Sequence, residues 1–304
     1  MKYLIVATAF VTAASADLVS DVRALTAKND FTAAEQRVEA FKTTQGASPE
    51  MILALSWLGR GAQASKQWDR AERYAQETRK LCLEALKARK LDDESQLPLA
   101  LGASIEVQGH VLAARGLRGE AVAFLRKELQ DWHATSIRTR IQKNIHVLSL
   151  EGKTAPALEM NQHLGPKPVP VASLKGKPVV LFFWAHWCGD CKQQGPVLAQ
   201  IQQEFASKGL VIVGPTQRYG YVARGRDAAP EEEVRYIDGI RQQFYGAIAD
   251  MAVPVSEENF RNFGASTTPT LVVIDRQGMV RLYHPGQMKY EELLPVVRSV
   301  VAGS

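Results

Sequence analysis

The chain has 304 residues, of which 23% are charged, and a formal net charge of +5. A chain of this length is typical of two domains rather than one. The charge excess is small, basic residues form no blocks, and glycine-rich phosphate-binding motifs are absent from the sequence. The composition therefore gives no reason to expect a protein that binds nucleic acid or nucleotides.

The first 16 residues have the pattern of a signal peptide. Lys2 supplies a positive charge, Tyr3 to Ala13 form an apolar segment, and Ala14-Ser15-Ala16 is a small-residue cleavage site. The apolar segment is shorter than the ~20 residues of a membrane span, and we expect no later window to approach that length. We therefore expect residues 1–16 to be removed. The mature chain would be exported, periplasmic or extracellular, with no membrane span.

Residues 17–150 are rich in Ala, Leu, Gln, Arg and Glu and predict helices with almost no strand pattern. Weak self-similarity places small residues at Ala34, Ala71 and Ala121. The spacing, 37 residues from Ala34 to Ala71 and 50 from Ala71 to Ala121, departs from the regular period of 34 residues in tetratricopeptide (TPR) repeats. We predict an all-α TPR-like domain over residues 17–150, with a plain helical bundle as the alternative.

This region contains a single cysteine, Cys82, within a helical pattern of apolar residues. We interpret Cys82 as a buried, unreactive thiol, because a free cysteine most often behaves as a small apolar side chain. The alternative is a regulatory or intermolecular thiol.

The composition changes near Glu151, after which Val-rich runs are separated by Pro and Gly. We expect a second domain over residues 151–304. The apolar run Val179–Trp184 predicts a buried strand, and the spacing of apolar residues from Val197 to Phe205 predicts a helix. Between the two stands Trp187-Cys188-Gly189-Asp190-Cys191.

Two thiols three residues apart can form a disulfide and open it again. Cys188 would lie at a helix N-terminus, where free N–H groups and the helix dipole lower a thiol pKa from its ordinary ~8.5. We expect an exposed, nucleophilic Cys188 and a less exposed, resolving Cys191. The alternatives are a static disulfide or half of a metal site. Because a four-thiolate zinc site needs a second pair and only Cys82 remains, we expect no metal.

The residues around this pair resemble the thioredoxin superfamily. The resemblance extends from about Glu151 to the C-terminus and is carried by Phe183 to Lys192, by Pro196 and by Thr267-Thr268-Pro269-Thr270. Gly176 to Leu181 and Ala155-Pro156 are similar to the secreted TlpA-like branch. The resemblance implies a thioredoxin-like α/β domain, with a central mixed sheet flanked by helices. It also implies thiol–disulfide oxidoreductase activity without a cofactor.

The resemblance further implies a substrate groove beside the cysteines. Pro269 would follow a cis peptide bond and lie against the pair, with the backbone of Thr268 presented to a client chain and Trp187 completing the groove. An ordinary X-Pro bond is cis only ~5–6% of the time, so the resemblance alone supports this expectation. The alternative is that Pro269 begins an edge strand.

Two departures from the family pattern affect the expected site. Phe182 stands where many thioredoxins have a buried aspartate that moves protons. His186 is a titratable neighbour of the pair, although a solvated loop histidine is the interpretation we favour. Between the cysteines stand Gly189 and Asp190. The Asp190 carboxylate would disfavour the thiolate and make the couple more reducing, or else chiefly stabilise the first helical turn.

The remaining elements are expected in a fixed order along the chain. Strands are predicted at 210–213, 252–255, 271–274 and 279–283, a loop at 217–226, and helices from Pro230 to about Gly246 and up to Phe263-Gly264. Proline at the first helical position followed by three acids supports the start at Pro230.

These observations predict an exported thiol–disulfide oxidoreductase that acts on client proteins with thiols or disulfides and exchanges electrons with an unidentified redox donor or acceptor. A helical-repeat interaction scaffold with a regulatory redox switch is the first alternative. A peroxidase of the peroxiredoxin type is the second. The peroxidase is disfavoured because the pattern Pro-x-x-x-Thr-x-x-Cys is missing at Cys188.

Overall fold

The computed structural model describes residues 17–303, and of Val171 and Ala172 the backbone only. The expected signal peptide, residues 1–16, lies outside this range. The chain divides into two compact units, Met1–Val111 and Leu112–Ser304.

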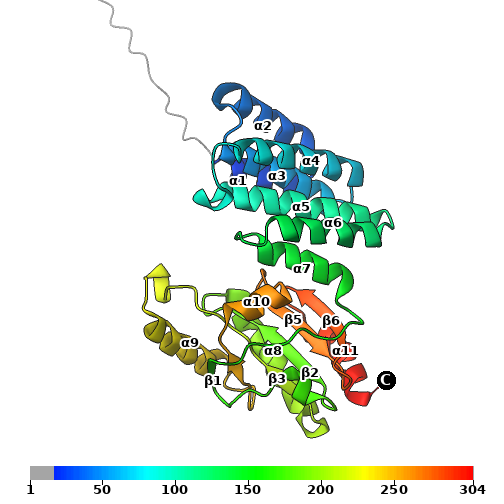
Figure 1. Cartoon of the computed structure of the whole chain (residues 1–304), viewed down its shortest axis with the longest axis vertical. Helices are drawn as coiled ribbons and strands as arrows, with labels where there is room; N and C mark the ends of the chain where they lie inside the picture. Colours follow the sequence, from blue (N-terminus) through cyan, green and yellow to red (C-terminus); the bar gives the residue numbers. More distant parts are fainter. Residues whose placement is uncertain (1–16, 304) are drawn as a thin grey trace, which may run out of the picture. The chain divides into compact units, whose positions relative to one another are not determined.

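The described part of the N-terminal half is entirely helical, as Figure 1 shows. Its helices are α1 (Leu18–Ala27), α2 (Phe31–Gln45), α3 (Pro49–Ala64), α4 (Trp68–Ala85), α5 (Gln96–Ala114), α6 (Arg118–Asp131) and α7 (Arg138–Ser149). Side chains of Asp17, Asp30 and Ser48 accept N–H groups at the starts of α1, α2 and α3, as helix N-caps do. The all-helical expectation for this region is confirmed.

Three helix pairs, α1–α2, α3–α4 and α5–α6, are joined by turns of the same geometry. Each turn has one residue in the left-handed conformation: Asn29 (φ 59°), Lys66 (φ 57°) and Gly116 (φ 83°). In each, the following residue donates its N–H to the carbonyl five positions earlier, as in Asp30 to Leu25. The same bond joins Gln67 to Ala62 and Leu117 to Leu112. The sequence therefore builds three copies of one helix–turn–helix unit.

The three turns are separated by the same numbers of residues as the three alanines that repeat in the sequence. The alanines at 34, 71 and 121 each follow the left-handed turn residue by five positions, and all three are fully buried. The three positions thus share complete burial in the first turn of the second helix of each pair. The internal repeat is thus confirmed as structural, with unequal distances between its copies.

Helix α5 corrects one expectation from the sequence. It is long and apolar enough, by length and composition alone, to cross a membrane. Of the 18-residue apolar stretch in this helix, 56% is buried inside the protein, including Leu97, Leu101 and Ile105. The core helix of a soluble protein meets the same criterion, so that this pattern is weak support for a membrane span.

Cys82 lies in α4 and is fully buried, as expected. Burial, with the nearby negative charge of Glu94, raises the pKa of this thiol to about 12. A thiol with so high a pKa is not a nucleophile at neutral pH.

The second unit contains a four-stranded mixed sheet in the order β3-β2-β5-β6 (Figure 1). Its strands are β2 (Val179–Phe183), β3 (Val211–Val213), β5 (Thr270–Ile274) and β6 (Val280–Pro285). Strand β2 runs parallel to β3 and antiparallel to β5, and β6 is antiparallel to β5. The short strands β1 (His163–Leu164) and β4 (Val253–Pro254) form a separate pair.

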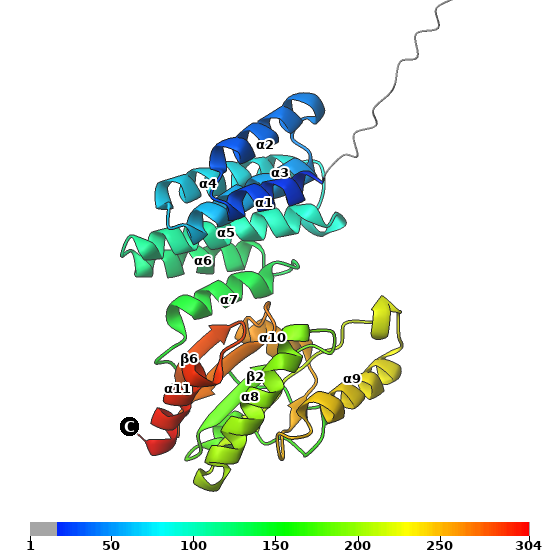
Figure 2. The same ribbon diagram turned by 180° about the vertical axis from the view of Figure 1, so that it is seen from behind.

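Helices cover both faces of this sheet, and every residue of β2 is therefore buried. Val180 and Phe182 face a core formed with α8 (Gly189–Phe205), α9 (Pro230–Tyr245) and α11 (Tyr290–Ala302). Figure 2 shows α8 and α11 in front of the sheet. The alternate residues of β2 face a second core formed with α10 (Glu257–Phe263). The predicted mixed sheet flanked by helices is confirmed.

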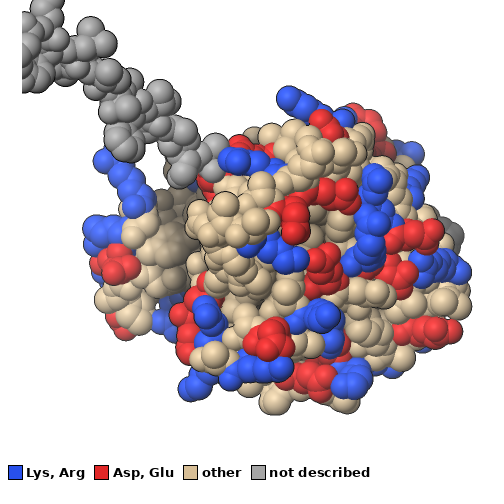
Figure 3. Space-filling view, turned by 90° about the horizontal axis from the view of Figure 1, so that it is seen from above, with Lys and Arg blue, Asp and Glu red and all other residues tan. Residues whose placement is uncertain are grey.

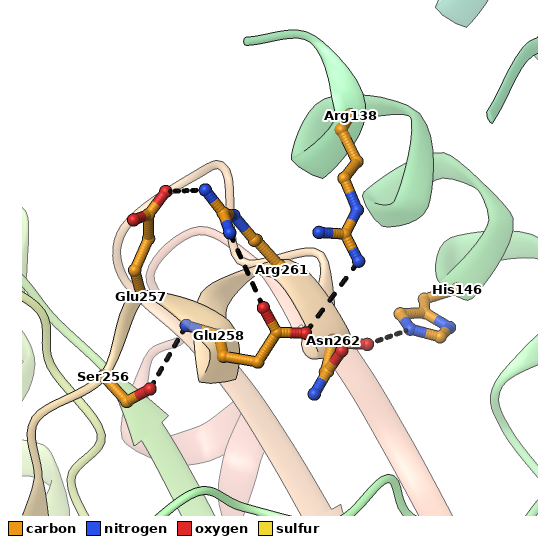
Figure 4. Close-up of polar contacts among 7 residues, drawn as sticks. All are labelled: Arg138, His146, Ser256, Glu257, Glu258, Arg261 and Asn262. Carbon is orange, nitrogen blue, oxygen red and sulfur yellow. Dashed lines mark hydrogen bonds and ion pairs between the residues drawn. The ribbon is translucent and has the colours of Figure 1, made fainter. Parts of the chain in front are cut away.

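Helix α7 packs against α10, as Figure 4 shows. Arg138 forms an ion pair with Glu258 at 3.9 Å, and the Nε2 atom of His146 lies 2.9 Å from the carbonyl oxygen of Asn262. Burial lowers the pKa of His146, so that its imidazole is neutral at neutral pH. At Gly264 (φ 61°), an added Cβ would lie 2.4 Å from the backbone nitrogen of Lys143. Any side chain there would push α7 away.

The packing of α7 explains why the division into units differs from the expected domain boundary. Composition changes near residue 151, where α7 has ended and the part of the chain that contains the strands begins. Packing instead divides the chain after Val111, and α7 contacts α10 and β6. The boundary between residues 150 and 151 stays a prediction.

Candidate functional site

The two cysteines lie where a buried strand is followed by a turn and a helix. Strand β2 ends at Phe183 and α8 begins at Gly189, with Cys188 as its N-cap residue. Cys188 and Cys191 are joined by a disulfide with their Cα atoms 5.3 Å apart, and Cys188 Sγ accepts the Cys191 N–H at 3.0 Å. The expected place of Cys188 at a helix N-terminus is confirmed.

Cys188 is less exposed than the sequence suggested. Its exposed fraction is 4%, against 0% for Cys191. The carbonyl oxygen of Thr268, from the segment that precedes β5, lies 3.4 Å from Cys188 Sγ. The expected order of exposure holds, with Cys191 the more deeply buried of the two.

The Thr268–Pro269 peptide bond is cis, as expected. Pro269 is buried directly before β5, and its carbonyl accepts the Gly286 N–H at 2.8 Å. The edge-strand alternative is wrong, because β5 lies between β2 and β6. The chain therefore brings Thr268 and Pro269 to the cysteine pair.

Two tryptophans flank the turn before Cys188 and have different environments. Trp184 is fully buried, donates its indole N–H to the Gly214 carbonyl at 2.9 Å and packs edge-on against Tyr245. Trp187 is 50% exposed, and its ring meets that of Tyr219 edge-on at 5.6 Å. A large, exposed aromatic surface thus lies next to Cys188 in the sequence.

The favoured interpretation of His186 as a solvated loop histidine is wrong. His186 is 1% exposed, and its ring lies edge-on to Tyr219, Tyr221 and Tyr236 at centroid distances of 5.5, 5.3 and 5.4 Å. Its Nε2 atom lies 3.4 Å from Glu233 Oε1. The covering residues come from α9 and from the loop before it. The residues next to His186 in the sequence do not predict its burial, because the tyrosines that cover it come from a distant segment.

Sequence reasoning missed Glu233, which it treated only as a first-turn acid of α9. The side chain is 1% exposed and accepts the backbone N–H groups of Tyr219 and of Gly220, the latter at 2.9 Å. A signal was present, since Glu233 shares a helix face with the buried Ile237 and Ile240, four and seven positions on. Periodicity could have identified it as an inward-facing acid.

Gln194 was also missed. It is buried, donates to the Met288 carbonyl at 3.1 Å and accepts the Met288 N–H at 2.9 Å. Nearby, Gln287 donates to the backbone carbonyl of Asp190 at 2.7 Å. These bonds tie the first turns of α8 to the segment before α11, while Gly189 and Asp190 stay exposed.

Phe182 occupies the position at which many thioredoxins have a buried aspartate. Phe182 is fully buried and packs edge-on against Tyr245 at 5.3 Å.

Between residues 17 and 303, no group of three or more His, Cys, Asp or Glu side chains is arranged to hold a metal ion. On the face drawn in Figure 3, positive and negative side chains are interspersed.

Comparisons with known proteins concern the C-terminal half of the chain. Residues 152–283 match the model of the AhpC/TSA family. The protein ResA, a thiol-disulfide oxidoreductase of Bacillus thuringiensis, is 26% identical over 142 residues, which are 47% of this chain and 73% of ResA. DsbE, a thiol:disulfide interchange protein of Xylella fastidiosa, is 27% identical over 158 residues, 50% of this chain and 72% of DsbE.

A solved structure, a thiol:disulfide interchange protein of the thioredoxin family from Chlorobium tepidum, overlaps the same half. It is 25% identical, covers 49% of this chain and 95% of its own, and has a TM-score of 0.37. Residues 152–283 thus form a thioredoxin-like domain of the AhpC/TSA type, and its relatives are thiol–disulfide oxidoreductases.

Proposed function

We propose that this protein is an exported thiol–disulfide oxidoreductase whose substrates are the cysteines of client proteins. The observation that carries the proposal is the bonded pair Cys188–Cys191 at the start of α8, with the Thr268 carbonyl 3.4 Å from Cys188 Sγ. The relationship to ResA and DsbE supports the same activity. Export is supported by the signal-peptide pattern of residues 1–16.

The reaction is a pair of thiol–disulfide exchanges. The Cys188 thiolate attacks one sulfur of a client disulfide, forms a mixed disulfide and releases the first client thiolate, which takes up a proton. Cys191, once deprotonated, attacks Cys188 Sγ and releases the second client thiolate. The Cys188–Cys191 disulfide forms again, and two electrons pass to the client. Exchange in the opposite direction uses the same atoms.

The docking groove would be formed by Trp187, Thr268 and Pro269. Trp187 offers an exposed aromatic face beside Cys188, and the Thr268 carbonyl beside the sulfur is an acceptor for a backbone N–H of a bound extended chain. Such a groove accepts many client sequences, because it contacts backbone rather than particular side chains.

Insulin reduction tests the proposed activity. We expect the purified protein to accelerate the reduction of insulin by dithiothreitol and to consume no hydrogen peroxide. Hydrogen peroxide is tested in parallel because a peroxidase of the peroxiredoxin type is the second alternative. Peroxide consumption without insulin reduction would favour the peroxidase alternative, and neither activity would favour the interaction scaffold.

We further propose that the couple is reducing, with Asp190 as one cause. A carboxylate in the first turn of α8 disfavours the Cys188 thiolate and so favours the disulfide. Asp190→Pro is expected to raise the midpoint potential by about 15–30 mV, a three- to tenfold change in the equilibrium with glutathione. Asp190→Asn is the control that removes the charge without adding a proline ring. An unchanged or lower potential in both variants would contradict this role.

The helical region is proposed to be TPR-like. Three helix–turn–helix units with the same turn geometry support a repeat architecture. Repeats of this kind stack side by side and present extended surfaces to peptides or proteins. A docking surface for clients is the role that such a domain would have beside a redox module.

A further inference from the structure

One buried carboxylate in the second unit, that of Glu233, contacts a residue far away in the sequence. In the described part of the chain the buried acids are Glu128, Glu233 and Asp275. Glu128 accepts the indole N–H of Trp132 at 3.0 Å, one helical turn away, and Asp275 accepts the N–H groups of the turn that follows it. Glu233 instead faces the imidazole of a residue far away in the sequence.

The contact between Glu233 and His186 is enclosed on all sides. Both side chains are 1% exposed, and 3.4 Å separates Glu233 Oε1 from His186 Nε2. Within residues 17–303 that nitrogen has no hydrogen-bond partner, and its contact with Glu233 is a charge contact. A buried charge is costly unless polar groups compensate it, and the backbone N–H groups of Tyr219 and Gly220 compensate the carboxylate.

The same cluster contacts the turn that carries the nucleophile. His186 stands two residues before Cys188, and Trp187, between them, packs on Tyr219. Tyr219 is in turn held by Glu233 through its N–H. Helix α9 is therefore connected to both residues that precede Cys188.

The groups that face His186 decide its charge. They are Glu233 and Tyr236 from α9, Tyr219 and Tyr221 from the loop before it, and Lys192 from α8. Burial lowers the pKa of His186 and so does Lys192, whereas Glu233 raises it, and the net direction is downward. At neutral pH the imidazole is neutral, and the pair carries the single negative charge of the carboxylate.

We propose that Glu233, in contact with His186, holds a buried negative charge beside the Cys188 turn and makes the Cys188–Cys191 couple more reducing. The proposal rests on the proposed redox function. A nearby negative charge disfavours the Cys188 thiolate and so favours the disulfide. When the pH falls through the pKa of His186, the imidazolium cancels the charge, and the effect of Glu233 disappears.

Glu233→Gln and Glu231→Gln form a matched pair of variants. Each removes one negative charge from the first turn of α9, but Glu231 is exposed. At pH 7, Glu233→Gln is expected to shift the equilibrium with glutathione roughly three- to tenfold toward the dithiol. The alkylation of Cys188 should reach half its maximal rate about 0.5–1 pH unit lower. Glu231→Gln should change neither quantity.

A folded Glu233→Gln protein with the wild-type equilibrium and alkylation profile would overturn the proposal. If Glu233→Gln does not fold, His186→Asn decides, since it keeps the carboxylate and removes the titrating ring. In the wild type, protonation of His186 below pH 7 should shift the equilibrium with glutathione toward the dithiol. In His186→Asn this pH-dependent shift should be absent. An unchanged pH dependence in His186→Asn would equally overturn the proposal. Wild-type insulin reduction, measured in parallel, fails only if the proposed function itself is wrong.

Discussion

Cys188→Ser is expected to reduce insulin reduction to the uncatalysed rate, a loss of at least ~1000-fold. A serine hydroxyl does not ionise at neutral pH and cannot form a disulfide, so that both the attack on the client and the storage of electrons are lost. Outside the pair, Cys82 cannot replace it, because that thiol is fully buried with its pKa raised to about 12. Insulin turbidity measured with equal amounts of folded protein gives the comparison.

Cys191→Ser should fail in a different way. Cys188 can still attack a client disulfide, but nothing resolves the mixed disulfide, which should accumulate as a larger species on a non-reducing gel and vanish with dithiothreitol. Cys82→Ala is the control, since it removes a thiol outside the proposed site. Equal activity in wild type and Cys188→Ser would show that the pair is not the reacting group and would favour the scaffold alternative.

Trp184→Ala is expected to lower the free energy of unfolding by about 3–5 kcal/mol. The side chain is fully buried, packs against Tyr245 and donates to the Gly214 carbonyl at 2.9 Å. Truncation would leave a cavity and an unpaired buried carbonyl beside the turn that leads to Cys188. Urea unfolding followed by circular dichroism measures the loss.

Trp187→Ala is the natural control for Trp184→Ala. The two tryptophans stand three residues apart, but Trp187 is 50% exposed. We expect a change of less than about 1 kcal/mol in the free energy of unfolding. The Michaelis constant for insulin should instead rise, because Trp187 lies at the proposed docking groove. Equal destabilisation by both substitutions would contradict the division into a core and a surface tryptophan.

Much of the fold was accessible from local sequence patterns. The strand before the cysteines, the helix after them and the start of α9 at Pro230 all agree with the structure, since burial on both faces and helical periodicity leave a clear trace in the residue order. The repeat in the helical region was also visible, because the alanines at 34, 71 and 121 mark one turn geometry.

Other features had no local trace. The packing of α7 on α10 moved the division between units ahead of the compositional boundary. The 4% exposure of Cys188 depends on the Thr268 segment, eighty residues later in the chain. Helix α5 is long and apolar enough for a membrane span, although more than half of its apolar stretch is buried inside the protein.

The sequence by itself determined the chemistry of this protein: two thiols at the N-terminus of a helix that follows a buried strand. Helix starts and strand ends depend on neighbouring residues, so that they can be read along the chain. Only the tertiary structure decided that His186 is buried and that Glu233 faces it. Burial and electrostatic environment depend on which distant segments cover a residue, and α9 brings that cover from 47 positions further along (233 − 186).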